Sequence, residues 1–171
     1  YHDNEWGRET HNDQMLFEYL ILEGMQAGLS WSLILKKREN FKRAFDNFDY
    51  NICANYTDEY LESLREDASI IRNKLKIYSV RKNALAFIKV QKEFGSFDKY
   101  IWGFTNYKKI NNKLESYKDA ASESELSTKI SKDLKKRGFS FVGGTIIYSY
   151  LQAIGMINDH EKGCFCYKEC C

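Results

Sequence analysis

The chain has 171 residues, of which 43% are hydrophobic and 29% are charged. Such a length and composition are typical of one globular domain with its own core, and they exclude a disordered chain. The net charge of +2 is too small to indicate nucleic-acid binding by itself. No apolar run approaches the ~18 residues of a membrane span, and no segment has the layout of a signal peptide. We therefore expect a single domain over residues 1–171, cytoplasmic and without membrane contact, and we expect further residues upstream because the chain opens at Tyr1 instead of Met.

Hydrophobic periodicity predicts helices along most of the chain, which contains no proline. Asp13 and Ser30 stand where helix N-caps are expected, and Thr57 begins a further helix. The predicted helices cover about 13–27, 30–38, a stretch from 57, 74–94, 124–136 and 145–154. The polar stretch 103–122 reads as a surface loop, and no segment alternates convincingly as a strand. The sequence therefore predicts an all-α fold.

The first predicted helix carries a carboxylate on its apolar face. Glu23 follows Tyr19 by four residues and Leu20 by three, which places all three on one side of the helix. A buried carboxylate needs hydrogen bonds or stays protonated. Glu23 could therefore cap a neighbouring helix, pair with a buried arginine, or line a pocket and meet a ligand.

A turn at residues 26–31 then presents Trp31 at the start of the next helix. A tryptophan after a turn is usually part of the core. An indole beside a buried carboxylate is also what a flipped-out base requires, because the ring offers a stacking surface and the carboxylate accepts from an exocyclic amine.

Basic residues gather at 36–38, 72–82 and 132–137, either as solvated helix faces or as a binding surface. Of the five cysteines, Cys53 is isolated and reads as a buried core residue. The other four crowd residues 164–171, which indicates metal binding more than disulfides in a chain with no export signal. His160 and Cys164, spaced H-x3-C, could supply half of a zinc site.

Four stretches together resemble the DNA-3-methyladenine glycosylase I family: YHDNEWG at 1–7, LEGMQAGLSW at 22–31, KKRGF with FVG at 135–143, and NDH with GC at 158–164. The resemblance covers essentially the whole chain. It implies an all-helical protein of the helix-hairpin-helix glycosylase superfamily with a structural zinc. It also implies excision of 3-methyladenine from double-stranded alkylated DNA, and we expect a monomer.

The resemblance also implies roles for particular residues. The family's pocket glutamate falls on Glu23, its stacking tryptophan on Trp31 and its pocket tyrosine on Tyr1. Its zinc ligands fall on His2, His160 and Cys164, with an N-terminal cysteine that lies outside this sequence. The runner-up donors are Cys166 and Cys170, and Cys171 is the weakest. A closed set of four ligands leaves no position for water, so the expected zinc is structural.

The expected DNA-backbone contacts come from Ser69 and Arg72 in the hairpin at 67–72, where Ser69 replaces the usual glycine, and from Lys74 just after it. The catalytic aspartate of most helix-hairpin-helix glycosylases has no counterpart at residues 87–91, and Glu93 and Asp98 lie further on. This predicts a monofunctional glycosylase that uses water as nucleophile. The alternatives are a non-catalytic zinc-stabilised DNA-binding module and a small-molecule hydrolase with Glu23 as general base.

Overall fold

The computed structural model describes residues 1–170, apart from the side chain of Tyr117. The helices in chain order are α1 (Asp13–Gln26), α2 (Trp31–Ala44), η1 (Asp46–Phe48), α3 (Tyr50–Ala54), α4 (Asp58–Leu64), α5 (Lys74–Phe94), α6 (Phe97–Gly103), η2 (Tyr117–Asp119), α7 (Glu125–Lys136), α8 (Gly144–Ala153) and α9 (Phe165–Glu169). The fold is thus predominantly helical, as predicted. Among these helices none combines the length and apolarity needed to cross a membrane.

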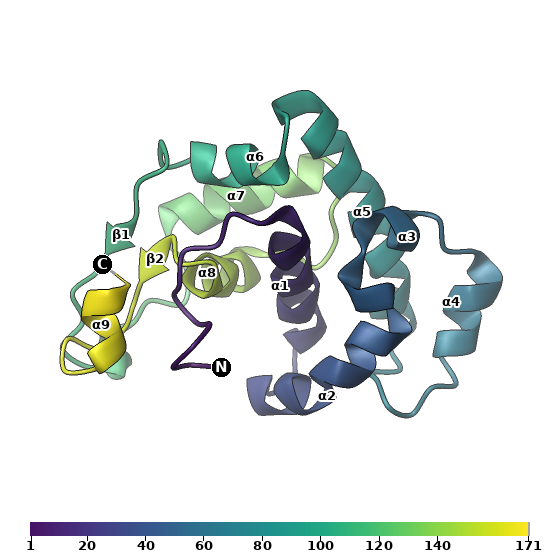
Figure 1. Cartoon of the computed structure of the whole chain (residues 1–171), viewed down its shortest axis with the longest axis horizontal. Coiled ribbons are helices and arrows are strands. Elements are labelled where there is room, and N and C mark those ends of the chain that lie inside the picture. Colours follow the sequence, from purple (N-terminus) through teal and green to yellow (C-terminus); the bar gives the residue numbers. More distant parts are fainter. Residues whose placement is uncertain (171) are drawn as a thin grey trace.

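Helix α1 lies at the centre of the molecule, between α5 on one side and α8 on the other (Figure 1). It packs against α2, α5, α6 and α8. All ten residues of α1 from Leu16 to Met25 are buried, because a central helix has neighbours on every side. This environment explains why Glu23, within that run, is held away from bulk water.

The structure corrects the prediction that the chain has no strand. Strands β1 (Ile110–Asn111) and β2 (Ile157–Asn158) pair in parallel, with Ile110 opposite Ile157. Each strand has two residues, too few for an alternation of apolar and polar residues to be visible in the sequence. β1 lies in the stretch expected to be a polar loop, and the pairing holds that stretch beside the segment that leads to the C-terminus.

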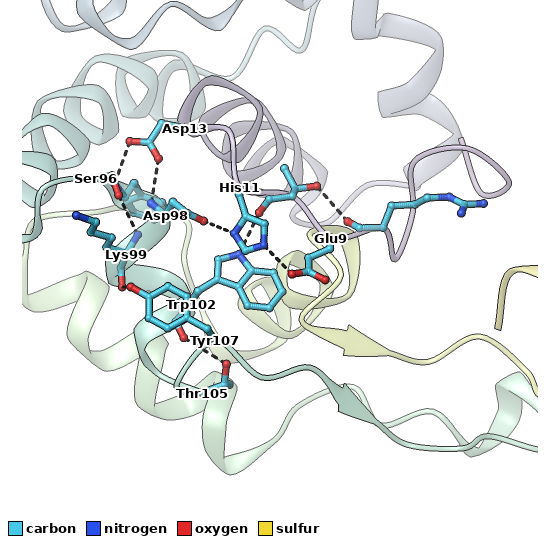
Figure 2. Close-up of polar contacts among 12 residues, drawn as sticks. Glu9, His11, Asp13, Ser96, Asp98, Lys99, Trp102, Thr105 and Tyr107 are labelled. Carbon is cyan, nitrogen blue, oxygen red and sulfur yellow. Dashed lines mark hydrogen bonds and ion pairs between the residues drawn. The ribbon is translucent and has the colours of Figure 1, made fainter. Parts of the chain in front are cut away.

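Ser30 caps α2 as predicted, and Thr57, where a helix was predicted to begin, caps α4. The expected cap at Asp13 is wrong, since the side chain of Asn12 caps α1 instead. The carboxylate of Asp13 accepts hydrogen bonds from the backbone N–H groups of Phe97 and Asp98, at 3.0 and 2.9 Å (Figure 2). It therefore caps α6, an interaction between distant segments that local sequence does not reveal.

Candidate active site

A cavity of about 260 Å³ lies between the N-terminal segment (residues 1–12), the end of α1, the start of α2 and one face of α8. Its lining residues are Tyr1, His2, Trp6, Glu23, Gln26, Trp31, Ser149 and Gln152. A larger hollow of about 600 Å³ runs along α7, but none of the residues that line it is buried. The smaller cavity is the better candidate, because binding sites gather buried titratable groups in a concave apolar setting.

Glu23 faces this cavity with only 4% of its surface exposed. Among the described residues no group donates a hydrogen bond to its carboxyl group, and no cationic side chain lies beside it. Glu23 therefore neither caps a helix nor pairs with an arginine. Burial raises its pKa to about 8. Near neutral pH the carboxyl group is therefore mostly protonated, and a cation brought beside it would favour the ionised form.

Two aromatic rings form a second wall of the cavity. Trp31 begins α2, which Ser30 caps, and Gly28 makes the preceding turn with a φ of +78° that favours glycine. The ring centroid of Tyr1 lies 5.4 Å from that of Trp31, with the planes tilted by 51°. Burial, followed by the nearby Glu23, raises the pKa of the Tyr1 hydroxyl, which is buried and has no hydrogen-bond partner among the described residues. Such an unpaired donor is costly unless a ligand satisfies it.

The position of Tyr1 depends on a partly buried ion-pair network. The backbone N–H groups of Glu5 and Trp6 donate to the carbonyl oxygen of Tyr1, at 2.8 and 3.0 Å. Arg38 of α2 donates in turn to the Glu5 carboxylate at 2.6 Å and to Glu18 of α1 at 2.9 Å. Arg38 belongs to the basic cluster at 36–38, yet its half-buried guanidinium fastens the N-terminal segment to α1 and α2.

The other end of the N-terminal segment is fastened to α6. The ring of His11 lies between Glu9 and Asp98, with its two nitrogens 2.7 and 2.5 Å from their carboxylates (Figure 2). Although partial desolvation opposes the charged ring, these acidic partners raise the pKa of His11 above its ordinary value. The indole of Trp102 packs against His11 and donates to the carbonyl oxygen of Thr10 at 3.0 Å. A segment without regular structure is thus fixed at both ends.

The hairpin residues Ser69, Arg72 and Lys74 lie in and after the loop between α4 and α5, outside the cavity lining. Arg72 and Lys74 are exposed. The backbone N–H and hydroxyl of Ser69 both donate to the Asp67 carboxylate, at 2.9 and 2.6 Å. The Ser69 carbonyl accepts from the side chain of Asn40 in α2 at 3.0 Å. The loop is therefore held firmly, and its basic side chains face solvent.

Lys76 is buried, although its basic cluster at 72–82 could have been a solvated helix face. Its side chain is buried, and its ammonium group donates to the carbonyl oxygens of Met25 at 2.9 Å and Ala27 at 2.6 Å. These carbonyls belong to the last turn of α1, where helices leave acceptors unpaired. Lys76 thus joins the start of α5 to the end of the helix that carries Glu23.

A possible metal-binding group lies beside the cavity. Ligand atoms of His2, Cys164 and Cys166 all lie within 4.8 Å of one another. Two of these three residues, His2 and Cys164, are predicted ligands, and Cys166 is one of the runner-up donors. Cys170 is buried outside this group, and Cys171 lies outside the described residues. Thiolate and imidazole donors of this kind suit zinc.

His160, the third predicted ligand, lies next to this group. Its ring centroid is 5.0 Å from that of His2, and its buried Nδ1 atom has no partner among the described residues. A Cβ atom on Gly7, which has a φ of +79°, would lie 2.6 Å from Nε2 of His160. Only glycine therefore allows the N-terminal segment to approach the imidazole so closely. The unpaired nitrogen and the neighbouring thiols fit a metal ligand.

Sequence reasoning missed four residues that line the cavity, namely Trp6, Gln26, Ser149 and Gln152. Trp6 lies in the N-terminal stretch that carries the family resemblance, and Gln26 ends α1 within the second stretch. Ser149 and Gln152 are three residues apart and so share one face of α8. A pair of polar residues at that spacing on an aromatic-rich helix is the signal that could have identified them.

Comparison with known proteins places the chain in a family. The family model described as methyladenine glycosylase matches residues 1–167. DNA-3-methyladenine glycosylase 1 of Escherichia coli K12 is 43% identical over 167 residues, which are 98% of this chain and 89% of the relative. DNA-3-methyladenine glycosylase of Haemophilus influenzae is 40% identical over 166 residues, 97% of this chain and 90% of the relative.

Solved structures of 3-methyladenine DNA glycosylase I are also similar to this chain. A crystal structure of a 3-methyladenine DNA glycosylase I matches with a TM-score of 0.95 and 42% identity, covering 98% of this chain and 92% of that one. The Staphylococcus aureus 3-methyladenine DNA glycosylase I, solved to explain 3-methyladenine recognition, matches with a TM-score of 0.94 and 34% identity over 96% of this chain and 88% of that one.

Proposed function

The chain belongs to the methyladenine glycosylase family, and we propose that its 260 Å³ cavity holds the damaged base during catalysis. The protein is an enzyme that excises 3-methyladenine from DNA by hydrolysis of an N-glycosyl bond, and not a non-catalytic binding module. The observation that carries the assignment of the site is the buried, unpartnered carboxyl group of Glu23 beside the aromatic wall of Trp31 and Tyr1.

Extrusion of the nucleotide from the duplex costs a few kcal/mol, which damage to the base partly offsets. Trp31 stacks on the extruded base. Methylation at N3 leaves the nucleoside cationic, and this charge favours the ionised form of Glu23. The ionised carboxylate accepts hydrogen bonds from the adenine edge. The unpaired hydroxyl of Tyr1 donates to a polar atom of the base. The methylated base already leaves readily as a neutral molecule, so the site needs to supply little acid catalysis.

Water is the proposed nucleophile, which makes the enzyme monofunctional. Glu93 and Asp98 are the two carboxylates that lie further along the sequence from the hairpin. Both are held in ion pairs, Glu93 with Arg137 and Asp98 with His11. Neither lines the cavity. Their ion pairs give them structural roles at the surface.

The hairpin between α4 and α5 supplies the proposed contact with the DNA backbone. Arg72 and Lys74 are exposed there and would neutralise phosphates, as in a helix-hairpin-helix motif. The Ser69 N–H donates to Asp67, so Ser69 meets a phosphate less directly than the usual glycine would. We assign His2, His160 and Cys164, with Cys166 adjacent, to a structural zinc that fastens the N-terminal segment to the C-terminal loop.

Release of free 3-methyladenine from methylated duplex DNA tests the site directly. Glu23→Gln removes the ionisable group and keeps the shape, so we expect release to slow by about 10²-fold. Glu39→Gln, which changes an exposed carboxylate of α2, should release the base at the parent rate. Full activity of Glu23→Gln would remove Glu23 from the reaction, and no release by the parent chain would contradict the function itself.

A further inference from the structure

A carboxylate with no cation lies directly behind the wall of the cavity. Asp159 is fully buried and forms no ion pair among the described residues. Its Oδ1 atom accepts from the side-chain amide of Asn112 at 2.5 Å, and its Oδ2 atom accepts from the hydroxyl of Tyr148 at 2.6 Å and the amide of Gln152 at 2.7 Å. Burial, followed by the bond to Asp159, raises the pKa of Tyr148, which keeps this hydroxyl a donor. Three donors thus converge on one acceptor group.

This arrangement fixes the direction of one side-chain amide. A carboxylate can only accept, so the amide nitrogen of Gln152 must face Asp159 and the amide oxygen must face the other way. Gln152 lines the cavity together with Ser149, one helical turn away on α8. The Oε1 atom of Gln152 has no hydrogen-bond partner among the described residues. It is therefore an acceptor of fixed direction that is available at the cavity wall.

We infer that Gln152 contacts the extruded base as a hydrogen-bond acceptor and that Asp159 is the positioning residue that fixes its amide. This inference rests on the proposed function and adds a second acceptor to the carboxylate of Glu23. Two acceptors suit a base edge that carries an exocyclic amine, because such an amine has two N–H donors. Guanine places an acceptor oxygen where adenine has this amine, so both side chains disfavour methylated guanine.

One substitution with two readouts separates this role from simple packing. Gln152→Met keeps the length of the side chain and removes the acceptor, so we expect about tenfold weaker binding of free 3-methyladenine by calorimetry, the loss of one hydrogen bond. The ratio of 3-methylguanine to 3-methyladenine excision should rise, because an acceptor that disfavours methylated guanine has been removed.

Asn112→Ala is the matched control, because it removes a donor to Asp159 that does not line the cavity. It should lower thermal stability and leave base affinity and the excision ratio unchanged. The inference is wrong if Gln152→Met binds the base as tightly as the parent, if its excision ratio stays at the parent value, or if Asn112→Ala weakens binding equally. A parent chain that binds no 3-methyladenine would instead contradict the proposed function, and this inference with it.

Discussion

The buried carboxyl group of Glu23, which we propose as the recognition group, carries a cost in stability when it ionises. Its raised pKa means that the folded chain holds this proton more tightly than the unfolded chain, whose glutamates titrate near 4.5. The stabilising contribution of the protonated form is therefore complete below about pH 4.5 and is lost as the pH rises through about 8. Active sites commonly keep such unfavourable groups because function needs them.

Glu23→Gln should for this reason be more stable than the parent at alkaline pH, although it is less active. The neutral amide has no ionisation to pay for, so the difference in the free energy of unfolding should grow between pH 5 and 8. It should approach about 5 kcal/mol at pH 9. Urea unfolding at a series of pH values measures it. A stability difference that does not change with pH would show that Glu23 titrates normally in the folded chain.

At the scale of elements, the end of α1 is held by a side chain from α5. The ammonium group of Lys76 satisfies the carbonyls of Met25 and Ala27, which flank Gln26 of the cavity lining in the sequence. Lys76→Met should destabilise the fold by about 1–3 kcal/mol, because these buried acceptors lose their donor. Lys82→Met, on an exposed position of the same helix, should stay within about 0.5 kcal/mol of the parent. Equal urea midpoints for the two variants would mean that Lys76 is as dispensable as a surface lysine.

The sequence predicts elements well where their cause is local. The bounds of α5 follow from its apolar stripe, and the starts of α2 and α4 follow from the caps at Ser30 and Thr57. Asp13 is the opposite case, because its partners in α6 are more than eighty residues away. A helix cap can be predicted from the spacing of nearby residues. The partners of a carboxylate that bonds to a distant segment can be known only once the packing of the helices is known.

The same distinction applies to the site. Glu23 could be singled out from the sequence because a carboxylate breaks a helical apolar face. Tyr1 and His2 have no periodicity around them, so only the family resemblance assigned them roles. The sequence does not single out Gln152, because its proposed role depends on the hydrogen bond from its amide to Asp159. Asp159 lies in the segment that follows α8 and folds back against that helix. A local pattern is enough to identify a buried carboxylate such as Glu23. The tertiary structure is needed to show that Asp159 orients Gln152.

At the scale of the whole molecule, the N-terminal segment closes the cavity and depends on contacts from three directions. Arg38 fastens it to α1 and α2, and His11 fastens it to α6. The third contact is with the start of α9, where His2 meets Cys164 and Cys166. A metal there would link segments from opposite ends of the chain, so its binding energy would add to the free energy of unfolding.

Elemental analysis should accordingly find close to one zinc per chain, and a chelator should lower the melting temperature. Each 1 kcal/mol of lost binding energy lowers the melting temperature of a domain this size by about 2–4 °C. His160→Ala and Cys164→Ser should destabilise the metal-loaded protein much more than the chelated protein. Cys53→Ser is the control, because this thiol is buried in the core and donates to the Phe45 carbonyl, so its effect should not depend on the metal. Base release should fall only as far as folding does, since a closed site offers no position for a reactive water. Metal-free protein that stays folded and loses all activity would place the metal in the chemistry and contradict the structural role.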